Sequence, residues 1–198
     1  MPARADTETC TAPPARRCRA RLRRFAREDR GGLAVEAIAM LPLLLWAFLA
    51  TYAFFDGYRM NNVNYRAAFT VADALSRETR EINEAYMDSA YGMLQFLADG
   101  EHEMKLRVTN VRFNEDDDAY EVRWSSVRGD WGPLTNTGLQ ELSSRIPELP
   151  GGNTVILVES RMIYEPIFKL GLVDPVEMEA FIVTRPRFAP QLKWAGTS

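Results

Sequence analysis

Residues Leu33 to Phe55, LAVEAIAMLPLLLWAFLATYAFF, form the one long apolar run of the chain. As a helix this run extends about 34 Å, at about 1.5 Å per residue, which is enough to cross a hydrocarbon core about 30 Å thick. Eight arginines precede it between Arg16 and Arg30, against only two acidic residues. Because basic flanks stay on the cytoplasmic side of a membrane, the sequence predicts a single span with a cytoplasmic N-terminus and an exported C-terminal part.

A cleaved secretory signal is the alternative interpretation of an apolar run behind a basic flank. The apolar cores of such signals are usually about 7 to 15 residues long and are followed by small residues at the cleavage site. Here aromatic side chains fill the far end of the run, at Trp46, Phe48, Tyr52, Phe54 and Phe55. Aromatic residues gather at membrane interfaces, so the pattern favours a retained span.

Charge and cysteine content divide the chain at the same place. The net charge is +5 up to Gly32 and −8 beyond it. An acidic exported part argues against nucleic acid as a partner, because binding to phosphates needs a basic face, whereas the arginine-rich flank is suited to anionic membrane lipid. Both cysteines, Cys10 and Cys18, precede the span, so the exported domain is predicted to fold without disulfides.

The hydrophobic periodicity predicts three regions. Residues 1–23 show no apolar period and are predicted to be a disordered basic tail; residues 24–55 form the juxtamembrane segment and span, and residues 56–198 the exported domain. Apolar residues at spacings of three and four predict helices: a continuation of the span to about Glu78, a second helix from about Ile82 to Gly100, and a short helix at Thr137–Arg145. Alternation of apolar and polar residues predicts strands at Met104–Phe113, Tyr120–Ser125, Thr154–Tyr164 and Glu177–Thr184. Helices followed by about four strands predict an α+β domain with an antiparallel sheet.

Two residues of the span carry functional hypotheses. Glu36 lies inside the apolar run, where an ionised carboxylate is costly and usually has a partner; the alternative is that it lies near enough to the headgroups to reach them or stays protonated. Pro42 is tolerated in a membrane helix and is expected to kink it. The bend is explained equally well by ordinary tolerance and by a need to pack against a neighbour.

Other polar groups give weaker indications. The acidic stretch Glu115 to Asp118 could offer oxygen ligands to calcium, but a solvated hairpin turn explains it better. Arg185 and Arg187 flank Pro186 and are predicted either to clamp carboxylates of the domain or of a neighbour, or to form ordinary surface salt bridges. The single histidine, His102, has no catalytic motif around it. The sequence therefore predicts no enzymatic activity, no cofactor and no metal.

The stretch RRFAREDRGGLAVEAIAMLPLLLWAF, residues 23–48, resembles the N-terminus of TadE/TadG-like minor pilins of tight-adherence (Flp) pilus systems, in which RxxRGxxAVExAxxxPxLL is typical. The segments VADALSRET, LRVTNVRF, YEVRWS and VTRPRF are also similar to this group. Like type IV prepilins, the chain has basic residues, Gly31 and then an apolar helix with Glu36 at the fifth position. The resemblance implies cleavage by a prepilin peptidase between Gly31 and Gly32, and pairing of Glu36 with the new amine of an adjoining subunit.

The resemblance predicts a minor pilin or pseudopilin that acts by packing against other pilus or secretion subunits. Its location would be the bacterial inner membrane, with a periplasmic C-terminal domain and a place in an extracellular filament as a further expectation. Gly32 stands where the family has a bulky residue, so a processed subunit and an uncleaved accessory both stay open. The alternative from another class is a bitopic sensor or ligand-binding protein, which the absence of a recognisable signalling module in the tail disfavours.

Overall fold

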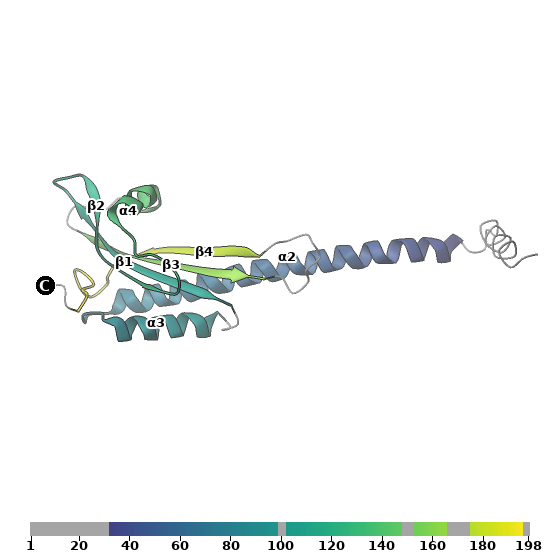
Figure 1. Cartoon of the computed structure of the whole chain (residues 1–198), viewed down its shortest axis with the longest axis horizontal. Coiled ribbons are helices and arrows are strands. Elements are labelled where there is room, and N and C mark those ends of the chain that lie inside the picture. Colours follow the sequence, from purple (N-terminus) through teal and green to yellow (C-terminus); the bar gives the residue numbers. More distant parts are fainter. Residues whose placement is uncertain (1–31, 99–101, 148–152, 166–174, 196–198) are drawn as a thin grey trace, which may run out of the picture. The chain divides into compact units, whose positions relative to one another are not determined.

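The computed structural model describes residues 32–98, 102–147, 153–165 and 175–195. The chain divides into two compact units, Met1–Leu49 and Ala50–Ser198. The elements appear in Figure 1, and their bounds are α2 Gly32–Arg77, α3 Glu84–Leu97, β1 Met104–Asn114, β2 Ala119–Arg128, α4 Asn136–Leu142, the 3-10 turn η2 Ser143–Arg145, β3 Thr154–Tyr164 and β4 Val176–Thr184. The α+β class is confirmed, with a long apolar N-terminal helix followed by a four-stranded sheet and a short helix.

The sheet has the strand order β2-β1-β3-β4, and every neighbouring pair is antiparallel. β1 and β2 form the predicted hairpin, whose turn at Glu115 to Asp118 places Asp118 at a φ of 49°. Aspartate tolerates this left-handed conformation better than most residues. The register of the hairpin shifts between Asn110 and Val111, and such a bulge adds twist to the strands.

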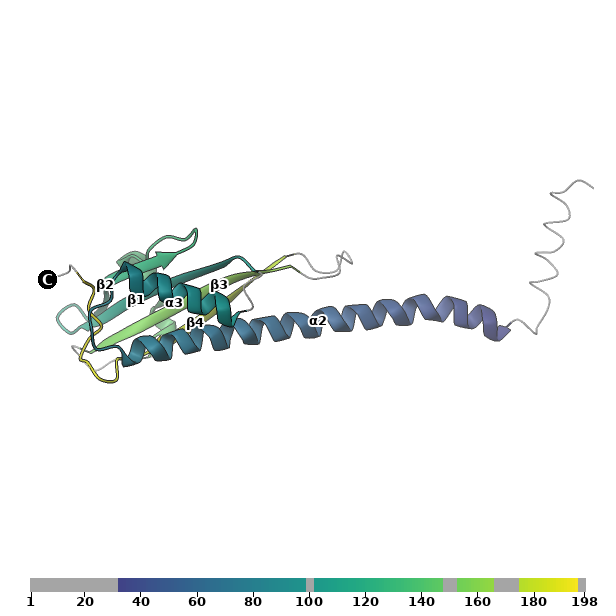
Figure 2. The ribbon, with the colours of Figure 1, turned by 90° about the horizontal axis from the view of Figure 1, so that it is seen from below.

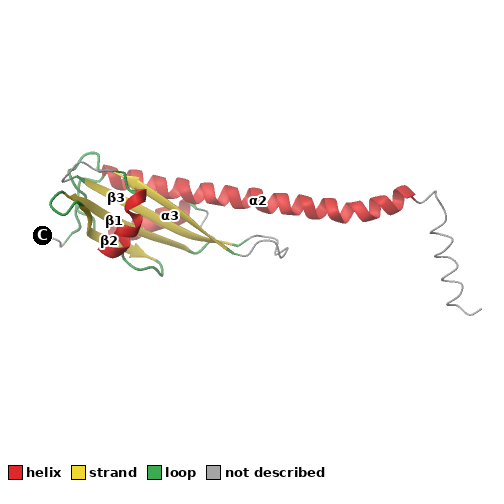
Figure 3. Ribbon diagram, turned by 90° about the horizontal axis from the view of Figure 1, so that it is seen from above, coloured by secondary structure: helices red, strands yellow, loops and turns green. Residues whose placement is uncertain are grey.

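Helices cover both faces of the sheet. Figure 2 shows α3 beside the C-terminal part of α2 on one face, and Figure 1 shows α4 on the opposite face. Figure 3 shows the strands from the side of α4. The larger core lies beneath α2 and α3, where Val71, Leu75 and Leu94 pack with Leu106 and Val158. A smaller core lies beneath α4; its buried members are Val111, Leu134, Leu139, Ile146, Val155 and Leu157.

Side-chain caps fix the starts of the two shorter helices. The Asn83 side-chain oxygen accepts a hydrogen bond from the Tyr86 backbone N–H at 2.9 Å, and the Thr135 hydroxyl accepts one from Gly138 at 3.4 Å. Such caps satisfy amides that the first helical turn leaves free. The predicted extension of the second helix from Ile82 is wrong, because this residue lies before α3 and forms a parallel bridge with Trp194. The predicted end at Gly100 lies outside the described residues, while α3 ends at Leu97.

Candidate functional site

The first part of α2 exposes its apolar side chains. Every residue from Val35 to Phe48 is exposed, with Ile38 at 74% and Leu44 at 64%. One helix of the described chain is long and apolar enough to cross a membrane, and its most apolar stretch contains no buried residue. A helix that is apolar on all sides and has no protein cover suits a lipid environment. This part of α2 is therefore consistent with single-pass anchoring.

The candidate processing and packing residues lie at the start of this helix. Gly31 lies outside the described residues, and Gly32 is the first residue of α2. Glu36 is exposed, so its carboxylate is available to an external partner. The helix continues through Pro42, although proline cannot donate the backbone hydrogen bond that the preceding turn would accept.

The second part of α2 is fastened to the sheet by a buried asparagine. Asn64 has an exposed fraction of 0%. Its side-chain oxygen accepts a hydrogen bond from the Ser160 hydroxyl at 2.8 Å, and its Nδ2 donates to the Met178 carbonyl at 3.2 Å. A buried amide is costly without such partners, so Asn64 fixes α2 against β3 and β4. Its position on the apolar stripe between Met60 and Ala67 was the sequence signal that could have indicated this role.

A second polar contact joins α2 to the end of β3. The Tyr164 hydroxyl donates to Asp56 Oδ2 at 2.7 Å, and only 4% of Tyr164 is exposed. Burial and the hydrogen bond to the Asp56 carboxylate raise the pKa of Tyr164 to about 12. The phenol therefore stays protonated and donating over the physiological range. Asp56 follows the apolar run directly, so this bond holds the helix to the sheet at the point where the predicted span ends.

The C-terminal segment crosses the end of α2. Arg187 Nη2 lies 3.1 Å from Asp73 Oδ1, and the Arg187 backbone N–H donates to the Ser76 carbonyl at 2.8 Å. Arg187 therefore contacts a carboxylate of its own domain, and both of the predicted roles, the clamp and the surface salt bridge, describe this contact. Arg185 is exposed. The segment continues to Leu192, whose carbonyl accepts hydrogen bonds from the Asn110 side chain and the Trp124 indole.

Paired charges cover the part of the sheet that lies beside α4. Arg107 makes a two-point ion pair with Glu159, at 2.7 and 2.8 Å, and both side chains are nearly buried. The guanidinium carbons of Arg107 and Arg161 lie 4.2 and 4.3 Å from the ring centroid of Trp131. Buried charges need such pairing, and cation–π contacts add to it. The Arg107 and Glu159 charges therefore compensate each other within the fold, and no local sequence pattern indicated that they are buried.

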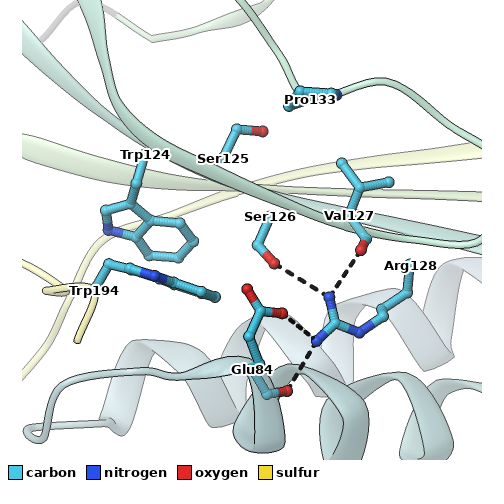
Figure 4. Close-up of a pocket in the computed structure, with 8 residues that line it drawn as sticks. All are labelled: Glu84, Trp124, Ser125, Ser126, Val127, Arg128, Pro133 and Trp194. Carbon is cyan, nitrogen blue, oxygen red and sulfur yellow. Dashed lines mark hydrogen bonds and ion pairs between the residues drawn. The ribbon is translucent and has the colours of Figure 1, made fainter. Parts of the chain in front are cut away.

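A pocket of about 590 Å³ lies between α3 and the edge strand β2, as Figure 4 shows. Arg128 reaches from β2 to Glu84 and Asp88 of α3, each at 2.6 Å. Burial lowers the pKa of Arg128, but the hydrogen bonds to both carboxylates outweigh it and leave the pKa raised. Ser125, in the same pocket, hydrogen-bonds to Thr109 and to the Leu134 backbone N–H. The Arg128 contacts join α3 to β2, whereas the Ser125 hydrogen bonds join β2 to β1 and to Leu134.

Comparison of the chain with protein-family models, with curated proteins and with solved structures finds no significant match.

Proposed function

We propose that this protein is a membrane-anchored minor pilin or pseudopilin-like subunit of a Tad/Flp pilus assembly or secretion system, acting by packing against neighbouring subunits. The observation that carries the proposal is that the two parts of α2 have different surroundings. The helix exposes apolar side chains from Val35 to Phe48 and packs on the sheet from Met60 to Leu75. A single helix that serves as both span and core element is what a subunit drawn from a membrane into an assembly would need.

The position of Glu36 supports the same proposal. Its carboxylate is exposed on the apolar part of α2, five residues after Gly31. A buried carboxylate and a buried amine are each costly alone and compensate each other when paired. In an assembly, Glu36 would pair with the amine that cleavage before Gly32 creates on an adjoining subunit. An uncleaved chain would act as an anchored accessory of the same machinery.

Two substitutions test this function in cells that assemble the filament. Glu36→Ala is expected to insert and fold normally, because removal of a charge eases membrane insertion, and yet to lower filament assembly. Glu36→Gln is the matched control for shape, and it should fail as Glu36→Ala does if the charge is what matters. Gly31→Leu should leave the precursor at full length. Normal filaments from Glu36→Ala would contradict the role of this carboxylate.

A further inference from the structure

The C-terminal part of α2 carries a second apolar face that the sheet does not use. Phe55, Tyr58, Asn62, Tyr65 and Phe69, here called the outer stripe, follow one another at spacings of three and four residues. All five are exposed, with Tyr58 at 69% and Phe69 at 56%. The buried residues of the same helix, such as Asn64 and Val71, lie on its other side. Large aromatic side chains gathered on one exposed face mark an interaction surface.

Lipid does not account for the whole outer stripe. Beyond Phe55 the helix carries Asp56, Arg59, Arg66 and Asp73, which are costly inside a bilayer. The same part of the helix packs on the sheet of a folded domain. Tyr58, Tyr65 and Phe69 therefore lie beyond the predicted span and need another cover.

The spacing of the outer stripe is that of a coiled coil. In a seven-residue repeat written a to g, Phe55, Asn62 and Phe69 occupy a, and Tyr58 and Tyr65 occupy d. The same positions upstream include three large apolar residues, Leu41, Leu44 and Phe48, and one threonine, Thr51. Apolar residues at a and d place a 3.5-residue seam against a partner helix and produce a left-handed supercoil. We propose that α2 pairs through the outer stripe with α2 of a second copy of this chain, as a parallel coiled coil.

The polar residues in and beside the seam specify the partner and its direction. An asparagine at a single a position sets register and oligomer state, and Asn62 meets its own counterpart only when two copies align in parallel. Within the outer stripe the two e positions, Arg59 and Arg66, are exposed and basic, whereas the g positions Asn61 and Ala68 are uncharged. In a parallel pair e faces g of the partner, while in an antiparallel pair e faces e. Only the antiparallel arrangement would bring the arginines together.

The surface beside the outer stripe has a groove that can receive side chains of a second helix. A groove of about 430 Å³ lies between α2 and the outer edge strand β4, and Phe54, Tyr58 and Asn61 of α2 line it together with Val176 and Met178 of β4. Side chains from the partner helix can enter this groove. The inference does not rest on the proposed function, because Glu36 occupies a c position away from the seam and a bitopic sensor could dimerise in the same way.

Cysteine cross-linking of the full-length chain in membranes tests the pairing. In a background of Cys10→Ser and Cys18→Ser, Tyr65→Cys should give a disulfide-linked dimer under a mild oxidant, on the order of tenfold more than Thr70→Cys, an exposed b position five residues further along the helix. Equal yields at the two positions, or no dimer at Tyr65→Cys, would overturn the proposal. Cross-linking of Tyr65→Cys does not depend on filament assembly, so its failure leaves the proposed function standing.

A mixed experiment tests the direction. Copies with Phe69→Cys should cross-link to one another, whereas a mixture of Phe55→Cys and Tyr65→Cys copies should give no 55-to-65 product, because these positions are about 15 Å apart along a parallel pair. An antiparallel pair places a opposite d, so a 55-to-65 product would show that arrangement and contradict the proposal. Tyr65→Glu should dissociate the dimer without lowering the melting temperature of the domain, and Thr70→Glu should leave the dimer intact. Dimers that persist in Tyr65→Glu would also contradict it.

Discussion

The two parts of α2 differ in how their apolar side chains are arranged around the helix. From Val35 to Phe48 the apolar side chains are distributed all round the helix and every one is exposed. From Ala50 to Arg77 they are periodic, and residues such as Ala68, Val71 and Leu75 are fully buried against the sheet. The comparison teaches that the distribution of apolar residues around a helix, more than their number, indicates whether lipid or protein covers it.

The largest expected effect is on the free energy of unfolding, which should respond to truncation of a leucine in the second part of α2 but not in the first. Leu75→Ala should lower the free energy of unfolding by about 2–5 kcal/mol, because it empties space in a packed core. Leu45→Ala is the matched control, since Leu45 is 54% exposed and has no protein core to lose. Chemical unfolding of the full chain in detergent, followed by tryptophan fluorescence, measures both variants. Equal losses of stability would show that the comparison is wrong.

Adding a charge to either part of α2 tests which part holds the protein in the membrane. Leu44→Arg places a charge within the predicted span, at a cost of about 2.5–3.5 kcal/mol for the arginine at the centre of a membrane helix. The membrane-bound fraction should fall, as measured by carbonate extraction and blotting. Thr70→Arg, which adds the same charge to an exposed position in the second part, should remain fully membrane-bound. Loss of Thr70→Arg from the membrane would contradict the assignment of the two parts.

A smaller effect is expected where the second part of α2 is fastened to β3. Tyr164→Phe removes the hydrogen bond to Asp56 and should cost about 1.5–3 kcal/mol, as is usual for hydrogen bonds to charged groups. Tyr120→Phe is the control, because the Tyr120 hydroxyl donates only to a neutral carbonyl at 3.3 Å. If Tyr164→Phe lowers the free energy of unfolding no more than Tyr120→Phe does, the hydrogen bond between Tyr164 and Asp56 does not have the expected strength.

The same pair gives a pH dependence of definite sign. The pKa of Tyr164 is raised to about 12 in the folded protein, against about 10 for an unfolded tyrosine. The unfolded chain therefore releases the proton first as the pH rises. The stabilisation by Tyr164 should be complete below about pH 10 and disappear between about pH 10 and 12. The difference in unfolding free energy between wild type and Tyr164→Phe, measured across this range, should shrink as the pH rises.

The smallest expected effect is at the C-terminal segment. Arg187→Ala removes an exposed ion pair with Asp73 and should cost about 0.2–1 kcal/mol. The loss should be smaller at high salt, because screening already weakens the wild-type pair. Thermal melts at two salt concentrations measure it, with Arg185→Ala as the control. A salt-independent loss would show that Arg187 acts through its packing and not through its charge.

The sequence predicted the elements well because each has a local signal. Val155 to Val158 form an apolar run typical of a buried strand, and Thr137–Arg145 carries a helical stripe that the structure places in α4 and η2. The start of α3 was missed because Ile82 fits the helical period, while its actual contact is with Trp194, more than a hundred residues away. Local periodicity contains no information about such a bridge.

The polar contacts were harder to predict for the same reason. Arg107 and Glu159 look like exposed strand residues until the register of β1 and β3 places them opposite one another. Tyr58 and Tyr65 fit the helical period that predicts the continuation of the span to about Glu78, yet both are exposed. The sequence showed that this helix is amphipathic, and the sheet decides which of its two apolar faces is buried. The outer stripe can therefore be recognised only from the structure, which shows that the sheet buries the other face of the helix.

The central proposal, that α2 passes from lipid into a folded exported domain, is tested most directly by thiol labelling of the full chain. Cys10→Ser and Cys18→Ser would be combined with either Leu44→Cys or Thr70→Cys, two positions that are both exposed in the protein itself. Under a membrane-impermeant maleimide, we expect Thr70→Cys to react in intact spheroplasts and Leu44→Cys to react only after denaturation. Equal reaction of both positions in intact spheroplasts, or reaction of Thr70→Cys only after lysis, would contradict the account.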